Sequence, residues 1–174
     1  MLVARKISED AWLDMPLHDS DSISDITTKK HELSVWKVND DLSNLNEVAL
    51  AIALSRDYVS GIYLVLLNPE EIRERFSWDL DIKQSDGDTL YTTMRKDHVN
   101  LMITTLTEMG YIAEYIHKSI DSPKIKYIDE IILKEILYNE AQAGHIENLK
   151  SKGRWKRAMD DYIKENDLQP IRYS

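Results

Sequence analysis

The fold is decided by residues 42–67, which read LSNLNEVALAIALSRDYVSGIYLVLL. The run 62–67 is apolar without alternation, which is typical of a strand that is covered on both faces. Before it, apolar residues recur at helical spacing over 45–52, and Ser43 or Asn44 is placed to accept hydrogen bonds from the first free N–H groups of that helix. This stretch therefore predicts a buried helix, a short link and an interior strand.

The remaining patterns predict a single domain around this unit. Strands are expected over residues 32–38, 78–83, 89–94 and 111–116, the middle two forming a hairpin at Asp86-Gly87. Helices are expected over residues 68–76, 97–110 and from 122 onward. The fold class is α+β, with a mixed sheet of four to five strands flanked by helices. We expect residues 1–30 to be loosely structured, residues 31–118 to form the sheet-containing core and residues 122–168 to be helical, all within one domain, 1–174.

Composition excludes several classes of protein. There is no cysteine, which removes disulfides, thiolate metal sites and cysteine nucleophiles. The longest apolar runs, 48–54 and 62–67, are too short to cross a bilayer. The first residues are followed by polar residues and not by an apolar signal segment. We therefore expect a cytoplasmic protein that does not associate with membranes.

The formal net charge of −9 is unevenly distributed. Residues 1–120 carry 21 acidic and 12 basic side chains, whereas the remainder carries ten of each. The densest acidic stretch, residues 9–25, contains no lysine or arginine, and its carboxylates are Glu9, Asp10, Asp14, Asp19, Asp21 and Asp25. Such a surface repels nucleic acid and attracts a basic partner. These six residues are predicted to bind another protein, with solubility alone as the alternative reading.

Motifs for phosphate binding, acyl transfer and metal binding are absent. The five glycines are scattered singly, so no phosphate-binding loop and no nucleophile elbow can be built. The five histidines are far apart, and Glu114 and His117 give only one E-x-x-H pair, whose side chains would point to opposite faces of the strand expected there. The other histidines are expected to be solvated or to lie beside helices. We expect no bound metal and no cofactor.

One pattern resembles an enzyme family. Pro69-Glu70 is followed, eleven residues after Glu70, by Asp81-Ile82-Lys83, which is similar to the P-(D/E)…(D/E)-x-K arrangement of the metal-dependent nuclease superfamily. The resemblance implies that Glu70 and Asp81 would hold Mg²⁺ and that Lys83 would orient water. It covers about fifteen residues, and Glu70 falls at a proline-capped helix start where that family has a strand.

A basic segment gives a third interpretation. Residues 150–157 contain five cations around Trp155, and these are Lys150, Lys152, Arg154, Lys156 and Arg157. Phosphates and a stacked base would suit such a patch. However, Trp155 also belongs to the apolar stripe of a final helix, which favours a place in the core.

The preferred interpretation is a non-enzymatic protein–protein interaction module, similar in role to an immunity protein or an antitoxin-like inhibitor. It depends on the absent catalytic motifs, the acidic stretch, and the nine tyrosines and four tryptophans against one phenylalanine. Rings with a polar group suit protein interfaces. The alternatives are a nuclease centred on Glu70, Asp81 and Lys83, and a nucleic-acid-binding protein that uses residues 150–157.

Overall fold

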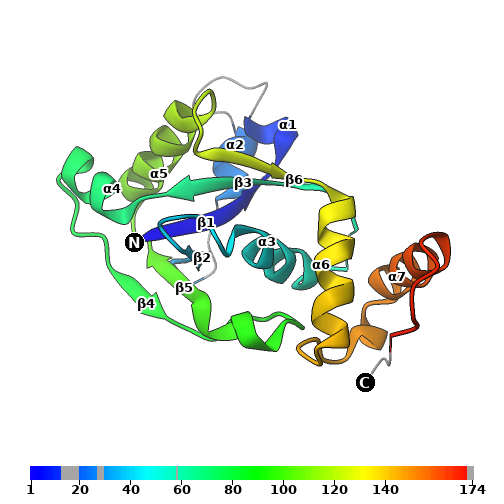
Figure 1. Ribbon diagram of the computed structural model, residues 1–174. Coiled ribbons are helices and arrows are strands. Elements are labelled where there is room, and N and C mark those ends of the chain that lie inside the picture. The colour runs from blue at the N-terminus through cyan, green and yellow to red at the C-terminus, as the bar shows by residue number, and fades with distance from the viewer. Residues whose placement is uncertain (13–19, 27–29, 58, 172–174) are drawn as a thin grey trace.

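The computed structural model describes residues 1–12, 20–26, 30–57 and 59–171, which form an α+β domain around one antiparallel sheet (Figure 1). The strand order is β4-β5-β2-β1-β3-β6, so the sheet has six strands where four to five were expected. The strands are β1 (Leu2–Ile7), β2 (Glu32–Val38), β3 (Ile62–Leu67), β4 (Ile82–Gln84), β5 (His98–Met102) and β6 (Ile125–Ile128).

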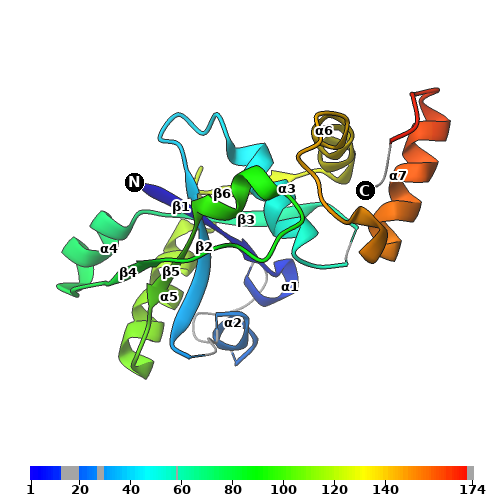
Figure 2. The ribbon, with the colours of Figure 1, turned by 90° about the horizontal axis from the view of Figure 1, so that it is seen from below.

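Helices cover both faces of the sheet, as Figures 1 and 2 show from two directions. One face packs against α1 (Glu9–Trp12), α2 (Ser20–Asp25), α4 (Pro69–Phe76) and α5 (Leu106–Ser119). On the other face α3 (Leu45–Leu54) packs on the sheet, and α6 (Glu130–Gln142) packs against α3. The 3₁₀ helices η1 (Thr92–Asp97) and η2 (Leu149–Ser151) belong to the same hydrophobic cluster, and α7 (Gly153–Glu165) packs against α6 and η2. Within the described residues, none of the helices combines the length and the apolar character needed to cross a bilayer.

The predicted unit over residues 42–67 is confirmed. Eight of the ten residues of α3 are buried, and β3 pairs with β1 on one side and with β6 on the other. The capping detail differs from the prediction, because Asn44 is the N-cap residue but makes no side-chain cap bond. Its Oδ1 accepts from the N–H of Asn39 instead, at 2.8 Å. The helix is thus held by burial of its apolar surface and not by its cap.

β2 confirms the predicted alternation, because Leu33 and Val35 lie in one core cluster and Trp36 and Val38 in the other. β1 falls within the segment that was expected to be loosely structured, and it pairs with both β2 and β3. The sequence did not predict this strand, because β1 contains Arg5 and Lys6 and charged residues rarely occupy an interior strand.

The predicted hairpin across residues 78–94 does not form. β4 pairs with β5 and not with residues 89–94, of which residues 92–94 already belong to η1. Asp86 and Gly87 lie in a longer irregular connection, in which the N–H of Gly87 donates to the carbonyl oxygen of Arg95 at 2.9 Å.

Residues 97–119 also differ from the prediction. The expected helix over 97–110 is instead the strand β5 followed by the start of α5, which continues through Gly110 and includes the expected strand 111–116. A capping box explains where α5 begins: Thr105 Oγ1 accepts from the N–H of Glu108 at 3.1 Å, and Glu108 Oε2 accepts from the N–H of Thr105 at 3.0 Å.

The helix expected from Ser122 begins later. Residues 125–128 form β6, an edge strand of the sheet, and α6 follows it directly. Asp129 is the N-cap of α6, and its Oδ1 accepts from the N–H of Ile131 at 2.7 Å. The region expected to be helical therefore also contributes a strand.

Candidate functional site

Three of the six carboxylates predicted to bind a partner lie on the surface. Glu9 and Asp10 begin α1, and Asp21 lies in α2; all three are exposed. Asp25 has a structural role instead, because its Oδ2 accepts from Trp12 Nε1 at 2.8 Å and from the N–H of Ser8 at 3.1 Å. Asp14 and Asp19 lie outside the described residues.

A groove of about 340 Å³ lies beside Glu9 and Asp10, where the end of β1 meets the start of β3. We call it the tyrosine groove, because Tyr63 of β3 and Tyr127 of β6 face one another across the strand register. Their ring centroids are 4.8 Å apart with an interplanar angle of 44°. The full lining is Lys6, Ile7, Ser8, Glu9, Asp10, Ser60, Gly61, Ile62, Tyr63 and Tyr127.

Hydrogen bonding fixes a carboxylate beside these rings. The hydroxyl of Tyr63 donates to Glu9 Oε1 at 3.1 Å. This hydrogen bond to Glu9 raises the pKa of the Tyr63 phenol because it stabilises the protonated form, and burial and the negative charge of Glu9 act in the same direction. Tyr63 therefore remains a hydrogen-bond donor at neutral pH. A cation that enters the groove meets both negative charge and two aromatic rings, and the faces of such rings attract cations.

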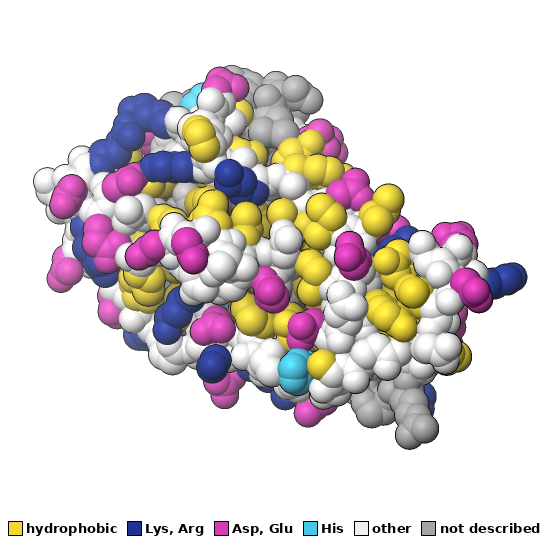
Figure 3. Space-filling model, in the orientation of Figure 1, with side chains coloured by type: hydrophobic (Ala, Val, Ile, Leu, Met, Phe, Trp, Pro, Cys, Tyr) yellow, Lys and Arg dark blue, Asp and Glu magenta, His cyan; other side chains and the backbone are white. Residues whose placement is uncertain are grey.

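Exposed apolar side chains lie at Tyr127 and a few residues after it in the chain. Tyr127 is 53% exposed, and Ile131 and Ile132 at the start of α6 are 66% and 38% exposed. Figure 3 shows that hydrophobic side chains reach the surface on the face it presents, interspersed with carboxylates. An aromatic and aliphatic centre with charged residues around it is the usual composition of a protein interface.

The edge of the sheet lies at the same place. The carbonyl oxygen of Lys124 accepts from the N–H of Leu66 at 2.8 Å. In an antiparallel pair the hydrogen-bonding direction alternates from residue to residue, so the N–H and C=O groups of Lys126 and Ile128 also point toward β3. The backbone of Tyr127 then points away from β3. Within the described residues no strand pairs with this outer edge of β6.

The three residues of the nuclease-like pattern lie on different elements. Glu70 is in the first turn of α4, where it pairs with the amino terminus of Met1 at 3.7 Å and with Arg73 at 3.8 Å. Asp81 precedes β4 and Lys83 lies within it, and both are exposed. Among the described residues, these three side chains make no hydrogen bond or ion pair with one another.

Glu114 and His117 lie on α5 and not on a strand, so they share a helix face, in contrast to the prediction. Glu114 is bound by two cations, Arg75 at 3.1 Å and Lys118 at 2.6 Å. In the described ranges, no group of three or more histidine, aspartate or glutamate side chains is placed to hold a metal ion.

The basic segment 150–157 spans η2 and the start of α7. Trp155 is fully buried, as the apolar stripe predicted, and its Nε1 donates to the carbonyl oxygen of Arg56 at 3.2 Å. This ring is not available for stacking on a base. Lys152 Nζ donates to the carbonyl oxygen of Ser55 at 3.3 Å, and Lys156 pairs with Asp160 at 2.5 Å. The exposed cations of the segment are Lys150, Arg154 and Arg157.

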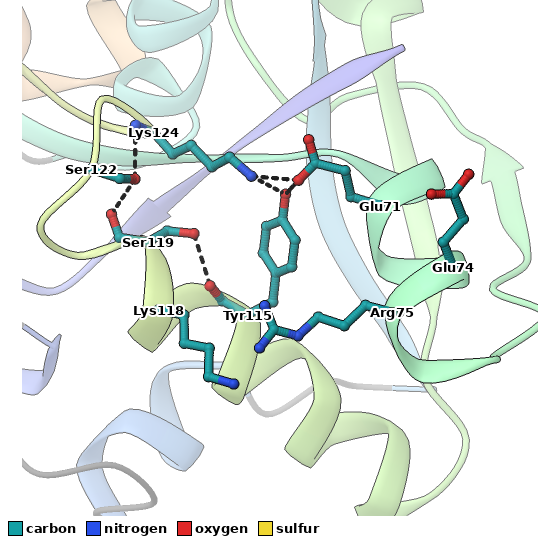
Figure 4. A pocket seen from close by; sticks show the side chains of 8 residues that line it. All are labelled: Glu71, Glu74, Arg75, Tyr115, Lys118, Ser119, Ser122 and Lys124. Carbon is teal, nitrogen blue, oxygen red and sulfur yellow. Dashed lines mark hydrogen bonds and ion pairs between the residues drawn. The ribbon is translucent and has the colours of Figure 1, made fainter.

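A second cleft, of about 540 Å³, lies between α4, α5 and the turn before β6 (Figure 4). At its centre, the Tyr115 hydroxyl donates to Glu71 Oε2 at 2.6 Å, and Lys124 Nζ contacts both that carboxylate and the Tyr115 oxygen. The hydrogen bond from Lys124, followed by that from Tyr115, lowers the pKa of Glu71. Burial is the main cause that raises the pKa of Tyr115. These groups satisfy one another, so the cluster ties α4 to α5 and to β6.

Comparison of the chain with protein-family models, with curated proteins and with solved structures finds no match.

Tyr63 and Tyr127 are the site residues that the sequence analysis did not find. They are far apart in the chain, and only the pairing of β3 with β6 brings them together. The richness in tyrosine was the one available signal.

Proposed function

We propose that this protein is a non-enzymatic cytoplasmic interaction module, and that it binds a basic segment of another protein in the tyrosine groove. The observation that carries the proposal is the pair of rings, Tyr63 and Tyr127, held beside the carboxylates of Glu9 and Asp10. A lysine or arginine of the partner would contact both the carboxylates and the ring faces.

Charge supports a basic partner. The chain carries −9, and the excess of acidic side chains lies in residues 1–120, which include the groove carboxylates. Lys6 also lines the groove, so the attraction depends on Glu9, Asp10 and the wider acidic surface together. Complementary potentials raise the association rate and suppress partners of the wrong charge.

An extended partner segment would also use the edge of β6. The outward backbone groups of Tyr127 can pair with an added strand, which is a common way of binding a peptide. The apolar side chains of such a strand would then reach Ile131 and Ile132, which are exposed beside it. An immunity or antitoxin-like inhibitor that covers a basic surface of its target would have these properties.

A binding titration tests this function. The ligand is a labelled peptide of alternating lysine and valine, and a peptide of alternating glutamate and valine is its control. We expect the basic peptide to bind, with the double substitution Glu9→Gln and Asp10→Asn weakening it by about tenfold and higher salt weakening it further.

The matched control variant carries Asp161→Asn and Glu165→Gln, two exposed carboxylates of α7 away from the groove. It changes the net charge equally and should leave the affinity within about twofold of the original, because distant exposed charges are screened. If both variants weaken binding equally, or if the acidic peptide binds as well as the basic one, the proposed function is wrong.

A further inference from the structure

A separate cavity of about 560 Å³ lies over β2 and β5, and we call it the sheet-face cavity. Its walls come from β1, β2 and β5, from Arg56 after α3 and from the segment 85–88 after β4. Its volume lies within the range of about 300–1,000 Å³ that is usual for small-molecule sites. The inference drawn from it does not depend on the partner proposed for the tyrosine groove.

The sheet is polar at this cavity although its other face is apolar. Ser34 is opposite Asn100 and Trp36 is opposite His98 in the pairing of β2 with β5. His98 is only 8% exposed and Asn100 only 6%, so two hydrogen-bonding side chains take positions that strands of a core normally give to apolar residues. The sequence analysis expected His98 to be solvated or to lie beside a helix. This expectation is wrong, because His98 is a buried residue of β5.

These polar groups form one network. Ser85 Oγ lies 2.7 Å from His98 Nδ1, and Asn100 Nδ2 donates to Ser85 Oγ at 3.2 Å and to Glu32 Oε2 at 3.3 Å. Burial lowers the pKa of His98, which favours the neutral imidazole. The cavity thus has a fixed polar floor whose hydroxyl, imidazole and amide groups can hydrogen-bond a ligand.

The wall beside this floor is cationic. Arg5 donates to the carbonyl oxygens of Ser34 at 3.1 Å and Asp25 at 2.6 Å, but no carboxylate lies within ion-pairing distance of it among the described residues. Its buried Nε has no hydrogen-bond partner. Burial lowers the pKa of Arg5, and the nearby charge of Arg56 acts in the same direction against the opposing effect of Asp25.

Arg56 and Lys30 line the same cavity and are exposed. Neither side chain makes an ion pair within the part of the chain that the structure describes. The Arg5 guanidinium is partly buried, donates only to carbonyl oxygens and lies near a second guanidinium, so an anion in the cavity would add to the partial compensation that the charge of Asp25 gives. Glu32, Asp86 and Asp88 also line the cavity, so its charge is mixed, which favours a ligand with hydrogen-bond donors besides its anionic group.

We propose that the sheet-face cavity binds a small organic anion, through a carboxylate or phosphate group held by Arg5 and Arg56. Hydroxyl or amino groups of the same ligand bond to Ser85, Asn100 and the acidic side chains. Arginine suits this role because its planar fork matches both kinds of oxyanion.

Calorimetric titration tests the site with two probes, glutamate and glucose 6-phosphate, each at up to millimolar concentration. We expect at least one of them to bind, and the probe that binds identifies the anionic group as carboxylate or phosphate. Arg56→Gln should weaken this binding by about tenfold, because it removes a charge partner without disturbing a buried residue. Arg157→Gln, an equal change at an exposed cation of α7, is the control and should leave the affinity unchanged.

The imidazole signals of His98 provide a second measurement, because an anion bound beside this ring raises its pKa and shifts its proton resonances. A shift on adding the probe, absent in Arg56→Gln, places the ligand in the cavity. The proposal is overturned if neither probe binds, or if the probe binds equally well to Arg56→Gln. It is equally overturned if Arg157→Gln weakens binding as much as Arg56→Gln does.

Discussion

The hydroxyl of Tyr127 lies directly over the backbone of Gly61, so that a Cβ atom at position 61 would be 2.2 Å from the tyrosine oxygen. The ring of Tyr127 can occupy the tyrosine groove only because the neighbouring residue has no side chain. The position of this ring, and with it the contact with Tyr63, is therefore linked to a single glycine just before β3.

Gly61→Ala should move the ring of Tyr127 and weaken binding of the lysine–valine peptide. The new Cβ atom would clash with the end of the Tyr127 side chain, which is half exposed and can rotate into solvent. We expect a loss in peptide affinity of about fivefold to tenfold, with less than about 1 kcal/mol lost from the unfolding free energy. Peptide titration and denaturant unfolding of the same sample measure both quantities. An unchanged affinity would show that the ring position does not matter.

Gly87→Ala should destabilise the fold, in contrast to Gly61→Ala. A Cβ at position 87 would lie 2.2 Å from the ring of Trp36, which is buried and cannot move aside. We expect the unfolding free energy to fall by about 1–3 kcal/mol, the usual cost of overpacking. Urea unfolding measures it, and a change below about 0.5 kcal/mol would contradict the packing of residues 85–88 over β2.

Gly110→Ala should stabilise the protein, because Gly110 lies inside α5 and a Cβ there meets nothing within 4 Å. Alanine is favoured over glycine in a helix interior by about 0.5–1 kcal/mol. Gly144→Ala is the contrasting variant, since Gly144 has a φ of +78° and an alanine there would cost about 1–2 kcal/mol. Thermal unfolding of both variants tests whether α5 continues through Gly110, and a lower melting temperature for Gly110→Ala would argue that it does not.

Glu71→Gln should remove a stabilisation that depends on pH. The pKa of Glu71 is lowered in the folded protein, so its ionised form stabilises the fold above the unfolded pKa of about 4.3, and this contribution is lost as the pH falls through the folded pKa. Because Glu71 is 49% exposed, we expect a difference of no more than about 1 kcal/mol at pH 7.

Unfolding of the original protein and of Glu71→Gln across the acid range gives this difference directly. It should shrink toward zero below pH 4. Glu74→Gln changes a neighbouring carboxylate of the same cleft for which no hydrogen bond is found among the described residues, and it serves as the control. A difference that persists at low pH would mean that the ionised form of Glu71 is not what stabilises the fold.

The sequence predicts the parts of the fold in which one pattern dominates. The apolar run 62–67 and the stripe over 45–52 correspond to β3 and α3, and the alternation over 32–38 corresponds to β2. The proline and acidic residues after Asn68 give the start of α4, where the Asn68 side chain accepts from the N–H groups of Glu70 and Glu71.

Where two patterns compete, the sequence was misleading. Gly110 predicted the end of a helix. The T-x-x-E signature at Thr105 and Glu108 instead marks the start of α5, a few residues before this glycine. The isoleucines after Ser122 fit a helix and a short strand equally well, and the pairing of β6 with β3 decides the outcome. Such pairing is tertiary information that local periodicity does not contain.

The candidate site was predicted only in part. Glu9, Asp10 and Asp21 are exposed as expected, but Asp25 is used inside the fold. The aromatic half of the groove depends on the register of β3 and β6. The polar floor of the sheet-face cavity likewise depends on the register of β2 and β5, so neither could be recognised from spacing along the chain.

The most direct test of the proposed function is an amide-resolved NMR titration of the protein with the lysine–valine peptide. The account predicts that chemical shifts change at residues 8–10, 60–63 and 125–128, the segments that form the tyrosine groove and the edge of β6. Saturable changes confined to the basic segment 150–157, or the absence of saturable changes at the groove, would contradict it.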